Sequence, residues 1–376
     1  MKPILYYKKN ISDLNPSLTI VLTTFNQELI VGRVIDSILL CSKMLFELII
    51  IDDSSEDKTL SNVLAKIMNM DLTRSQIVNV SVYRNTISKF ETYCDDFGIR
   101  QANTNSIIIL QSDIVITEQS FDDKLMAVFR YFPDILMVSG RGTESVVPIS
   151  RFFKRSNGSV VDLGLLTLFM SRRCVPKPMQ LLISYVCSLA DFAEKRLIHL
   201  KFALQSKLGV AKLGVAKLDD TNLDLIFPSQ AQFQLTGSAG FLTQHEPPEG
   251  IDVNKSAFLW VGQTVMRGPI ALDRSKYLEI GGFDLGSCFL GFDDHEIALR
   301  AYLRSNYRVG FVPVGYRSSL EWGVTRRPRS MKQSRIAIRN CLRTSKQRKL
   351  TPLFNLEQRS ISLPDPEIRQ LPFRNS

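Results

Sequence analysis

Acidic side chains cluster in a glycine-rich and aromatic-rich stretch, GGFDLGSCFLGFDDHEIALRA, which runs from Gly281 to Ala301. Carboxylates can move protons and bind divalent cations, so this stretch is the first candidate for chemistry. The same residues also form an Asp-x-x-Glu capping box from Asp293 to Glu296, which would satisfy free N–H groups at the start of a helix. Taken alone, the stretch is more typical of a structural cap than of a chemical site. The rest of the sequence is needed to decide between the two interpretations.

Polar side chains also follow three apolar runs upstream. The runs LTIVLTT, ELIII and SIIIL indicate buried strands. The polar residues at or just after their carboxyl ends are Thr24, Asp52, Asp53 and Asp113. In a doubly wound α/β sheet, ligands bind at this edge. Asp52 and Asp53 alone would suit a capped turn, but polar groups at three strand ends together favour a binding site.

The apolar periodicity predicts strands and helices in alternation, which implies a doubly wound α/β sheet. We expect strands at 18–24, 47–51, 77–83, 107–110, 135–139, 258–265, 270–272 and about 307–318. We expect helices ending near residue 42 and at 57–70, 91–104, 121–131 and 275–280. No Gly-x-Gly-x-x-Gly motif follows the first strand and no Walker A loop occurs. The usual NAD and P-loop interpretations therefore lose their main support.

The composition is that of a globular protein. The chain has 376 residues, 44% hydrophobic and 22% charged, which can bury a sizeable core. No run of eighteen apolar residues suggests a spanning helix, and the first ten residues lack the apolar region of a secretory signal. The six cysteines are scattered without C-x-x-C pairs, which predicts a reduced, cytoplasmic protein without a disulfide framework or structural zinc.

The net charge of +10 comes from one segment. Eleven Lys and Arg residues lie between Arg317 and Lys349, against the single acid Glu321, which leaves 36 basic and 36 acidic residues elsewhere. This distribution indicates a polybasic surface segment and argues against a nucleic-acid-binding protein. The segment is either a solvated basic helix or an anchor to anionic lipid on the inner face of a membrane.

Residues 145–257 interrupt the α/β pattern. Within them, 179–205 carries an amphipathic apolar stripe, which favours a helix packed on the domain over a helix at a membrane surface. A short duplication, KLGVAKLGVAKL, follows it. His245 and Glu246 lie in a Pro-rich loop and are weak evidence for a metal site.

Five motifs in order, LTIVLTTFNQE, ELIIIDDSSEDKT, IIILQSDIVI, RGPIALDRSKYLEIGGFD and GFDDHEIALRA, resemble the family 2 glycosyltransferases with the GT-A fold. The resemblance covers about 18–140 and 258–322. It implies a mixed, doubly wound sheet with a helical insertion and a basic C-terminal tail. The implied parts are an N-terminal extension (1–17), a nucleotide-sugar-binding half (18–144), a variable insertion (145–257), an acceptor and catalytic half (258–325) and a basic, mobile tail (326–376).

The resemblance also implies residue roles in an inverting sugar transfer from a nucleotide-diphosphate-sugar to a hydroxyl of a glycan, a lipid-linked or another acceptor. Asp294 matches the general base, and Asp293 or Glu296 could bind the acceptor. Asp113 matches the acid that holds Mn²⁺ or Mg²⁺ against the diphosphate. The residues that would contact the donor are Thr24, Phe25, Asn26, Asp52, Asp53, Gln111 and Asp113.

Two departures from the family pattern concern the metal. Gln111 replaces the first acid of the D-x-D motif, and no His follows His295 near the last strand. A non-catalytic protein that binds a nucleotide sugar, or a scaffold at a membrane surface, is therefore the alternative. A sugar-nucleotide pyrophosphorylase is disfavoured, because no Gly-rich phosphate loop follows the first strand. The sugar, the donor base and the linkage are not encoded in any motif found.

Overall fold

The computed structural model describes the two predicted halves of the fold and short pieces elsewhere. The described residues are 2–69, 76–141, 143–144, 234–235, 242–243, 258–262, 264–265, 267–286, 293–318 and 357–360, with single helical positions between 178 and 193 and between 331 and 343. In this part of the chain, no helix is long and apolar enough to cross a membrane.

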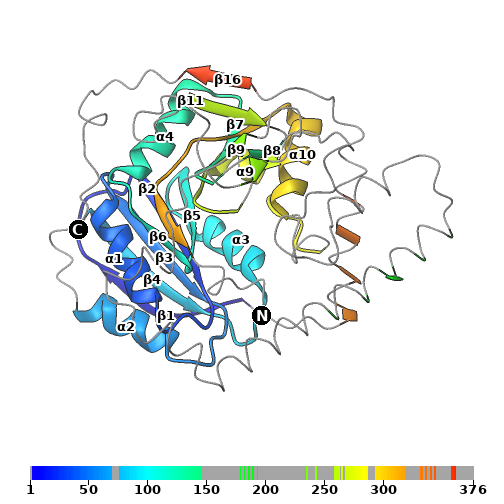
Figure 1. The fold of residues 1–376 in the computed structure, drawn as a ribbon. Helices are drawn as coiled ribbons and strands as arrows, with labels where there is room; N and C mark the ends of the chain where they lie inside the picture. Colours follow the sequence, from blue (N-terminus) through cyan, green and yellow to red (C-terminus); the bar gives the residue numbers. More distant parts are fainter. Residues whose placement is uncertain are drawn as a thin grey trace.

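A ten-stranded mixed sheet forms the centre of the molecule (Figure 1), in the order β1-β4-β3-β2-β5-β13-β7-β14-β11-β16. The sheet strands are β1 (Ile4–Asn10), β2 (Leu18–Thr24), β3 (Phe46–Asp52), β4 (Ile77–Arg84), β5 (Ser106–Gln111), β7 (Ile135–Ser139), β11 (Phe258–Gly262), β13 (Ile270–Asp273), β14 (Arg308–Phe311) and β16 (Glu357–Ser360). Strands β4, β3, β2 and β5 are parallel, and β13 runs antiparallel between β5 and β7. The mixed, doubly wound sheet is the predicted fold class.

Within the described residues, three small two-stranded sheets accompany the large one. They pair β6 (Ile114–Ile116) with β15 (Tyr316–Ser318), β8 (Thr143–Glu144) with β12 (Thr264–Val265), and β9 (Gln234–Leu235) with β10 (Leu242–Thr243). The β6–β15 pair places the segment after Gln111 beside a segment about 200 residues later in the chain.

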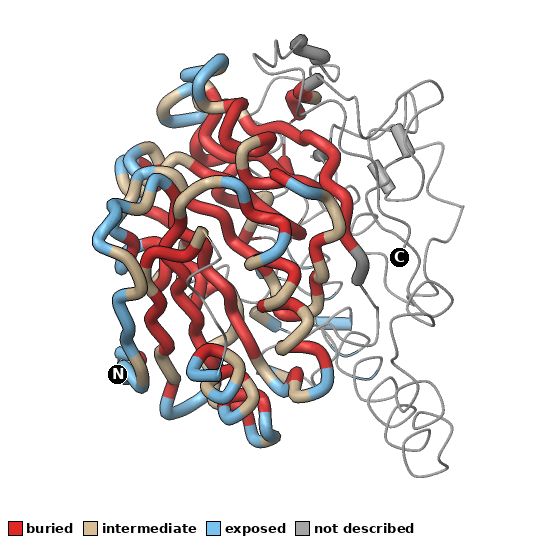
Figure 2. The backbone as a smooth tube through the Cα atoms, turned by 90° about the vertical axis from the view of Figure 1, so that its left-hand side faces the viewer, coloured by how far each residue is buried: buried red, intermediate tan, exposed pale blue. Residues whose placement is uncertain are grey.

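Two apolar clusters cover the two faces of the large sheet. Alternation along β2 explains the division, since Ile20 and Leu22 belong to one cluster and Val21 to the other. The first cluster includes α1 (Val31–Cys41), α2 (Thr59–Asn69) and α4 (Phe121–Tyr131). The second includes α3 (Glu91–Gln101), α9 (Arg274–Glu279) and α10 (Asp293–Ser305). Figure 2 shows this backbone largely buried.

Local patterns predicted several elements at their observed bounds, including β2, α4 and β7. Two predicted strands divide in the structure: 258–265 becomes β11 and β12, and 307–318 becomes β14 and β15, because each piece pairs with a different strand. Strands β1 and β16 were not predicted. They lie at the two edges of the large sheet, in the segments expected to be an extension and a tail.

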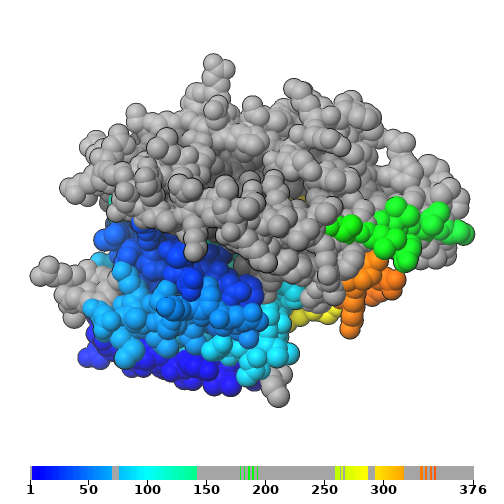
Figure 3. Space-filling model, turned by 60° about the horizontal axis from the view of Figure 1, so that its bottom comes forward, coloured from blue at the N-terminus to red at the C-terminus, as the bar shows by residue number. Residues whose placement is uncertain are grey.

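Two further segments are described only at helical positions. In the first, the positions are Pro178, Leu182, Tyr185, Val186, Leu189 and Ala193, and in the second they are Met331, Lys332, Arg335, Ile336, Arg339, Asn340 and Arg343. Figure 3 shows the first set in green beside the second in orange. The rest of the predicted helix 179–205, the duplication and the His245–Glu246 pair lie outside the described residues.

Candidate functional site

The carboxyl ends of β2, β3 and β5 meet at one edge of the sheet, as predicted. Thr24 lies opposite Asp52 and Thr23 opposite Gln111 in the strand register. The Thr24 hydroxyl donates to Asp52 Oδ1 at 3.3 Å, and Arg84 Nε lies 3.4 Å from Asp52 Oδ2. Burial raises the pKa of Asp52, although bonds from Ser55 and the charge of Arg84 oppose the shift.

Asp53 is fully buried and holds the loop that leads into α3. Its Oδ1 accepts bonds from Asn85 Nδ2 at 2.8 Å and from the Lys89 N–H at 2.7 Å. Its Oδ2 accepts bonds from the Ser88 hydroxyl at 2.7 Å and the Phe90 N–H at 2.9 Å. Asp53 therefore fixes the start of α3, whose first turn carries Glu91 and Thr92.

Phe25 and Asn26 continue from β2 towards solvent, Phe25 half-buried and Asn26 exposed. Asn26 has a positive φ of 49°, and its Oδ1 accepts the Glu56 N–H at 2.9 Å. Asn suits this left-handed conformation better than most residues. The turn after β2 is thus tied to the turn after β3, on the edge where the donor was expected.

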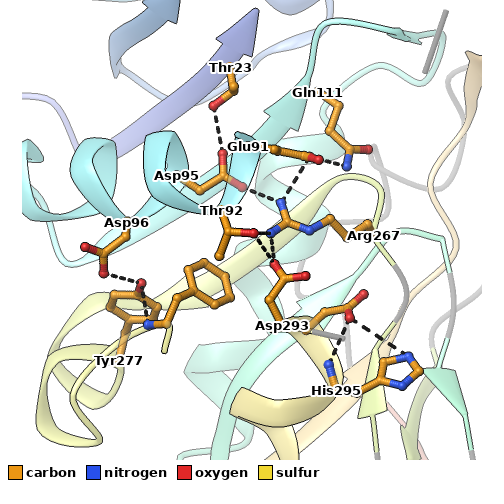
Figure 4. Close-up of polar contacts among 12 residues, drawn as sticks. Thr23, Glu91, Thr92, Asp95, Asp96, Gln111, Arg267, Tyr277, Asp293 and His295 are labelled. Atoms are coloured by element: carbon orange, nitrogen blue, oxygen red, sulfur yellow. Dashed lines mark hydrogen bonds and ion pairs between the residues drawn. The ribbon is translucent and has the colours of Figure 1, made fainter. Parts of the chain in front are cut away.

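Gln111 ends β5 and contacts α3. Its Nε2 donates to Glu91 Oε1 at 2.5 Å (Figure 4). The residue that replaces the first D-x-D acid thus directs its amide towards a carboxylate on the neighbouring helix. An acid at position 111 would place a second negative charge beside Glu91, and the neutral amide of Gln111 avoids that repulsion.

Arg267 lies at the centre of a group of carboxylates (Figure 4). Its guanidinium contacts Asp95 and Asp293, and Nη1 lies 3.0 Å from Glu91 Oε1. Asp95 also accepts the Thr23 hydroxyl at 2.8 Å. One cation therefore joins the end of β2, helix α3 and the start of α10.

Burial and charge oppose each other in this group. Burial lowers the pKa of Arg267, but the surrounding carboxylates Asp293, Glu91, Asp95 and Asp294 outweigh it and hold that pKa well above its ordinary value. Burial raises the pKa of Asp95, against the opposing effect of Arg267. Arg267 thus stays charged, and the three carboxylates in contact with it depend on that charge.

The start of α10 carries Asp293 and Asp294, with different surroundings. Asp293 is buried, and its Oδ2 accepts the Thr92 hydroxyl at 2.9 Å as well as Arg267. Asp294 is partly exposed, and its Oδ1 accepts the His295 N–H at 2.9 Å. Asp293 therefore has defined structural partners on α3 and the turn before β13, while Asp294 stands next to it at the helix start.

Glu296 and Arg300 form a buried ion pair along α10. Arg300 Nε and Nη2 each donate to one Glu296 oxygen at 2.9 Å. Arg300 also donates to the carbonyls of Ile280 and Gly282, at 2.5 and 2.6 Å. The observed partners of Arg300 are therefore an acid on its own helix and two loop carbonyls. Both Glu296 oxygens point forward along the helix to Arg300, whereas a capping box would direct the side chain back towards Asp293.

Asp113 lies in the turn between β5 and β6 and is half-buried. Its charge raises the pKa of the buried Tyr316 on the neighbouring β15, in addition to the larger effect of burial, with Arg141 opposing both. Among the described residues, no group of three or more His, Cys, Asp or Glu side chains is placed to hold a metal ion. Asp113 alone still fits such an ion, since Mg²⁺ often binds one or two carboxylates together with substrate phosphates.

Sequence reasoning missed Arg267 and its partners on α3. Arg267 lies within one of the quoted motifs, RGPIALDRSKYLEIGGFD, but received no role there. Glu91, Thr92 and Asp95 lie in a helix with a weak apolar pattern, which could have drawn attention because several polar residues face the sheet.

One family model matches the N-terminal part of the chain. Residues 19–155 match the model described as glycosyl transferase family 2. The match spans the elements from β2 to β8 and confirms the predicted resemblance to that family. The comparison with curated proteins found no match.

Solved structures of glycosyltransferases show a distant likeness. The mannosyltransferase PcManGT from Pyrobaculum calidifontis, in complex with GDP-Man and Mn²⁺, is 14% identical with a TM-score of 0.40. TarS from S. aureus is 12% identical (TM-score 0.37), and GalNAc-T7 with UDP, GalNAc and Mn²⁺ is 11% identical (TM-score 0.45). The alignments cover 81% of this chain but 57%, 37% and 44% of those chains, respectively. At these values the likeness assigns no residue roles.

Proposed function

We propose that this protein is an inverting glycosyltransferase that moves a sugar from a nucleotide-diphosphate-sugar to an acceptor hydroxyl. The observation that carries the proposal is the path of contacts from Gln111 through Glu91 and Arg267 to Asp293. It joins the end of β5, in the family-matched segment, to the helix start that bears the proposed base. This path supports the proposal, because a transfer reaction needs the proposed donor-binding edge and the proposed base close together.

Asp294 is the proposed general base. An acceptor hydroxyl must lose its proton as it attacks the anomeric carbon, and a single displacement assisted by one base inverts that carbon. The neighbouring Asp293 is held by Arg267 and Thr92, so the first turn of α10 is fixed in place. Asp293 supports this geometry, and contact of Asp293 or Glu296 with the acceptor remains part of the proposal.

The donor would lie at the ends of β2, β3 and β5. Thr24, Phe25, Asn26, Asp52 and Asp53 would shape the nucleoside pocket. Gln111 and Asp113 would face the diphosphate, and Asp113 would hold the divalent ion. A bound Mn²⁺ or Mg²⁺ would supply positive charge that stabilises the departing nucleoside diphosphate.

The acceptor is proposed only by chemical class, as a hydroxyl of a glycan, a lipid-linked sugar or another molecule. We propose a cytoplasmic location, peripheral on the inner face of a membrane, where a lipid-linked acceptor would be accessible.

The variant Asp294→Asn tests the proposal. Loss of the base is expected to lower the transfer rate by about 10²–10⁴-fold, while the thermal shift caused by the donor nucleotide is retained. Asp13→Asn, an exposed acid remote from the site, is the matched control and should transfer normally. An unchanged rate in Asp294→Asn would remove the assigned role. Nucleotide binding by the wild type without transfer to any acceptor would favour the non-catalytic alternative.

A further inference from the structure

Among the described positions of the segment 178–193, four large apolar side chains are exposed to solvent. Leu182, Tyr185, Val186 and Leu189 are 59%, 49%, 53% and 41% exposed. Their spacing of three, one and three residues places them on one face of a helix. A soluble helix normally turns such a face towards the core, so this stripe indicates an interaction surface.

A second helical segment, 331–343, turns a cationic face outwards. Lys332, Arg335 and Arg339 are exposed and share one face by their spacing of three and four residues. Asn340 is fully buried, and Arg343 contacts Asp284 and lies 3.9 Å from Glu296 Oε1. The segment is therefore seated on the acceptor half of the fold while its cations face solvent.

The two segments form one surface. The Arg335 guanidinium lies over the Tyr185 ring, 5.6 Å from its centroid. Figure 3 shows the two segments side by side. No acidic residue occurs among the described positions of either segment. We call the four apolar residues of the first segment and the three cations of the second the docking surface.

We propose that the docking surface binds the surface of an anionic lipid bilayer. Apolar side chains of an interfacial helix enter the boundary between headgroups and acyl chains, and neighbouring Lys and Arg residues attract anionic headgroups. Tyrosine favours the same interfacial depth. The strength of such binding increases with the buried apolar area and with the attraction to anionic lipid, and the docking surface supplies both.

The row of cations distinguishes a lipid partner from a protein partner. Cores of protein interfaces are depleted of charged residues overall, with lysine rarer but arginine more frequent there, so the distinction rests on the positive charge of all charged residues at the described positions of the two segments. A membrane accommodates both features, because the apolar stripe and the cations meet different layers of the bilayer. Through Arg343, the same helix is joined to the acceptor half, so membrane binding would place that half near lipid-borne hydroxyls.

Vesicle flotation of the full chain tests the proposal. The protein is expected to float with phosphatidylcholine vesicles that contain phosphatidylglycerol, much less with phosphatidylcholine alone, and less as salt increases. The triple variant Lys332→Gln, Arg335→Gln and Arg339→Gln should weaken binding to anionic vesicles by on the order of 100-fold. The double variant Leu182→Asn and Val186→Asn should also weaken it, because polar side chains do not enter the acyl boundary.

Matched controls carry the same changes at exposed residues elsewhere. They are Lys9→Gln, Lys43→Gln and Lys58→Gln for the cations, and Leu40→Asn and Met68→Asn for the apolar residues. Both controls should bind like wild type, and all variants should keep the wild-type melting temperature. Wild-type protein that fails to bind anionic vesicles would overturn the proposal, as would variants that bind normally. Self-association that only the Leu182→Asn and Val186→Asn variant abolishes, without vesicle binding, would assign the surface to a second copy of the chain.

Discussion

The Arg267 guanidinium contacts the Asp293 carboxylate, which joins the turn before β13 to the first residue of α10. The same guanidinium contacts Asp95 on α3, so one side chain connects α3 to α10. The three neighbouring carboxylates would repel one another without this cation, because they are largely buried. Arg267 is accordingly a positioning residue for the proposed base.

Arg267→Gln is expected to lower the unfolding free energy by about 3–5 kcal/mol, because it leaves buried carboxylates without their cation. Arg267→Lys should restore part of the stability but little of the transfer rate, since an ammonium cannot bind several carboxylates in the same planar arrangement. Urea unfolding and steady-state transfer rates measure the two effects. Arg304→Gln, an exposed arginine on α10, serves as control and should change the stability by less than about 0.5 kcal/mol. Wild-type stability in Arg267→Gln would contradict the interpretation.

Asp113→Asn is expected to abolish the additional thermal shift that Mn²⁺ gives with a nucleoside diphosphate. A bound ligand stabilises the folded state in proportion to RT ln(1 + [L]/Kd), and loss of the carboxylate raises Kd for the ion. A panel of nucleoside diphosphates, each with and without Mn²⁺, would also identify the base of the donor. Asp36→Asn on α1 is the control. An equal metal-dependent shift in Asp113→Asn would place the ion elsewhere.

Glu296→Ala is expected to lower the unfolding free energy by about 3–5 kcal/mol, because it leaves the buried Arg300 without its partner. The loop at 280–282, which Arg300 holds through two carbonyls, should loosen as well. Thermal unfolding of Glu296→Ala and Arg300→Met, alone and combined, gives the coupling between the two residues. If Glu296 contacts the acceptor instead, Glu296→Ala would raise the KM for the acceptor and leave the melting temperature unchanged.

Asp273 caps the short helix α9, and its lowered pKa makes the stability of the fold depend on pH. Burial raises its pKa, but bonds from Ser275 and the Lys276 N–H, with the charge of Lys276, outweigh it and leave the pKa lowered from 3.8. Because the pKa of Asp273 is lower in the folded state, its charged form stabilises the protein above pH 3.8. That contribution is lost as the pH falls through the folded-state pKa.

Asp273→Ala should therefore cost about 1 kcal/mol at pH 7. The difference from wild type should shrink as the pH falls below 3.8. Urea unfolding across that range measures it, with Asp13→Ala as an exposed control. A difference that stays constant with pH would show that the cap does not depend on the charge of Asp273.

The sequence alone predicted the α/β class, most elements of the first half and the meeting of three strand ends. These features depend on local information. An apolar run forms a buried strand wherever it occurs, and α4 and β7 have their predicted bounds because their periodicity is complete within eleven and five residues. The family motifs are also local, and the match over 19–155 agrees with them.

Only the tertiary structure decided which side chains meet. Arg267 contacts Asp95, 172 residues away in the chain, and no local pattern marks that pair. Edge strands β1 and β16 lack apolar periodicity, because only one side of each is paired and β1 is largely exposed. Glu296 likewise fits a capping box by spacing, but its oxygens bind Arg300 because burial requires a charge partner. Contacts of this kind depend on how the chain folds back on itself, which spacing along the sequence does not encode.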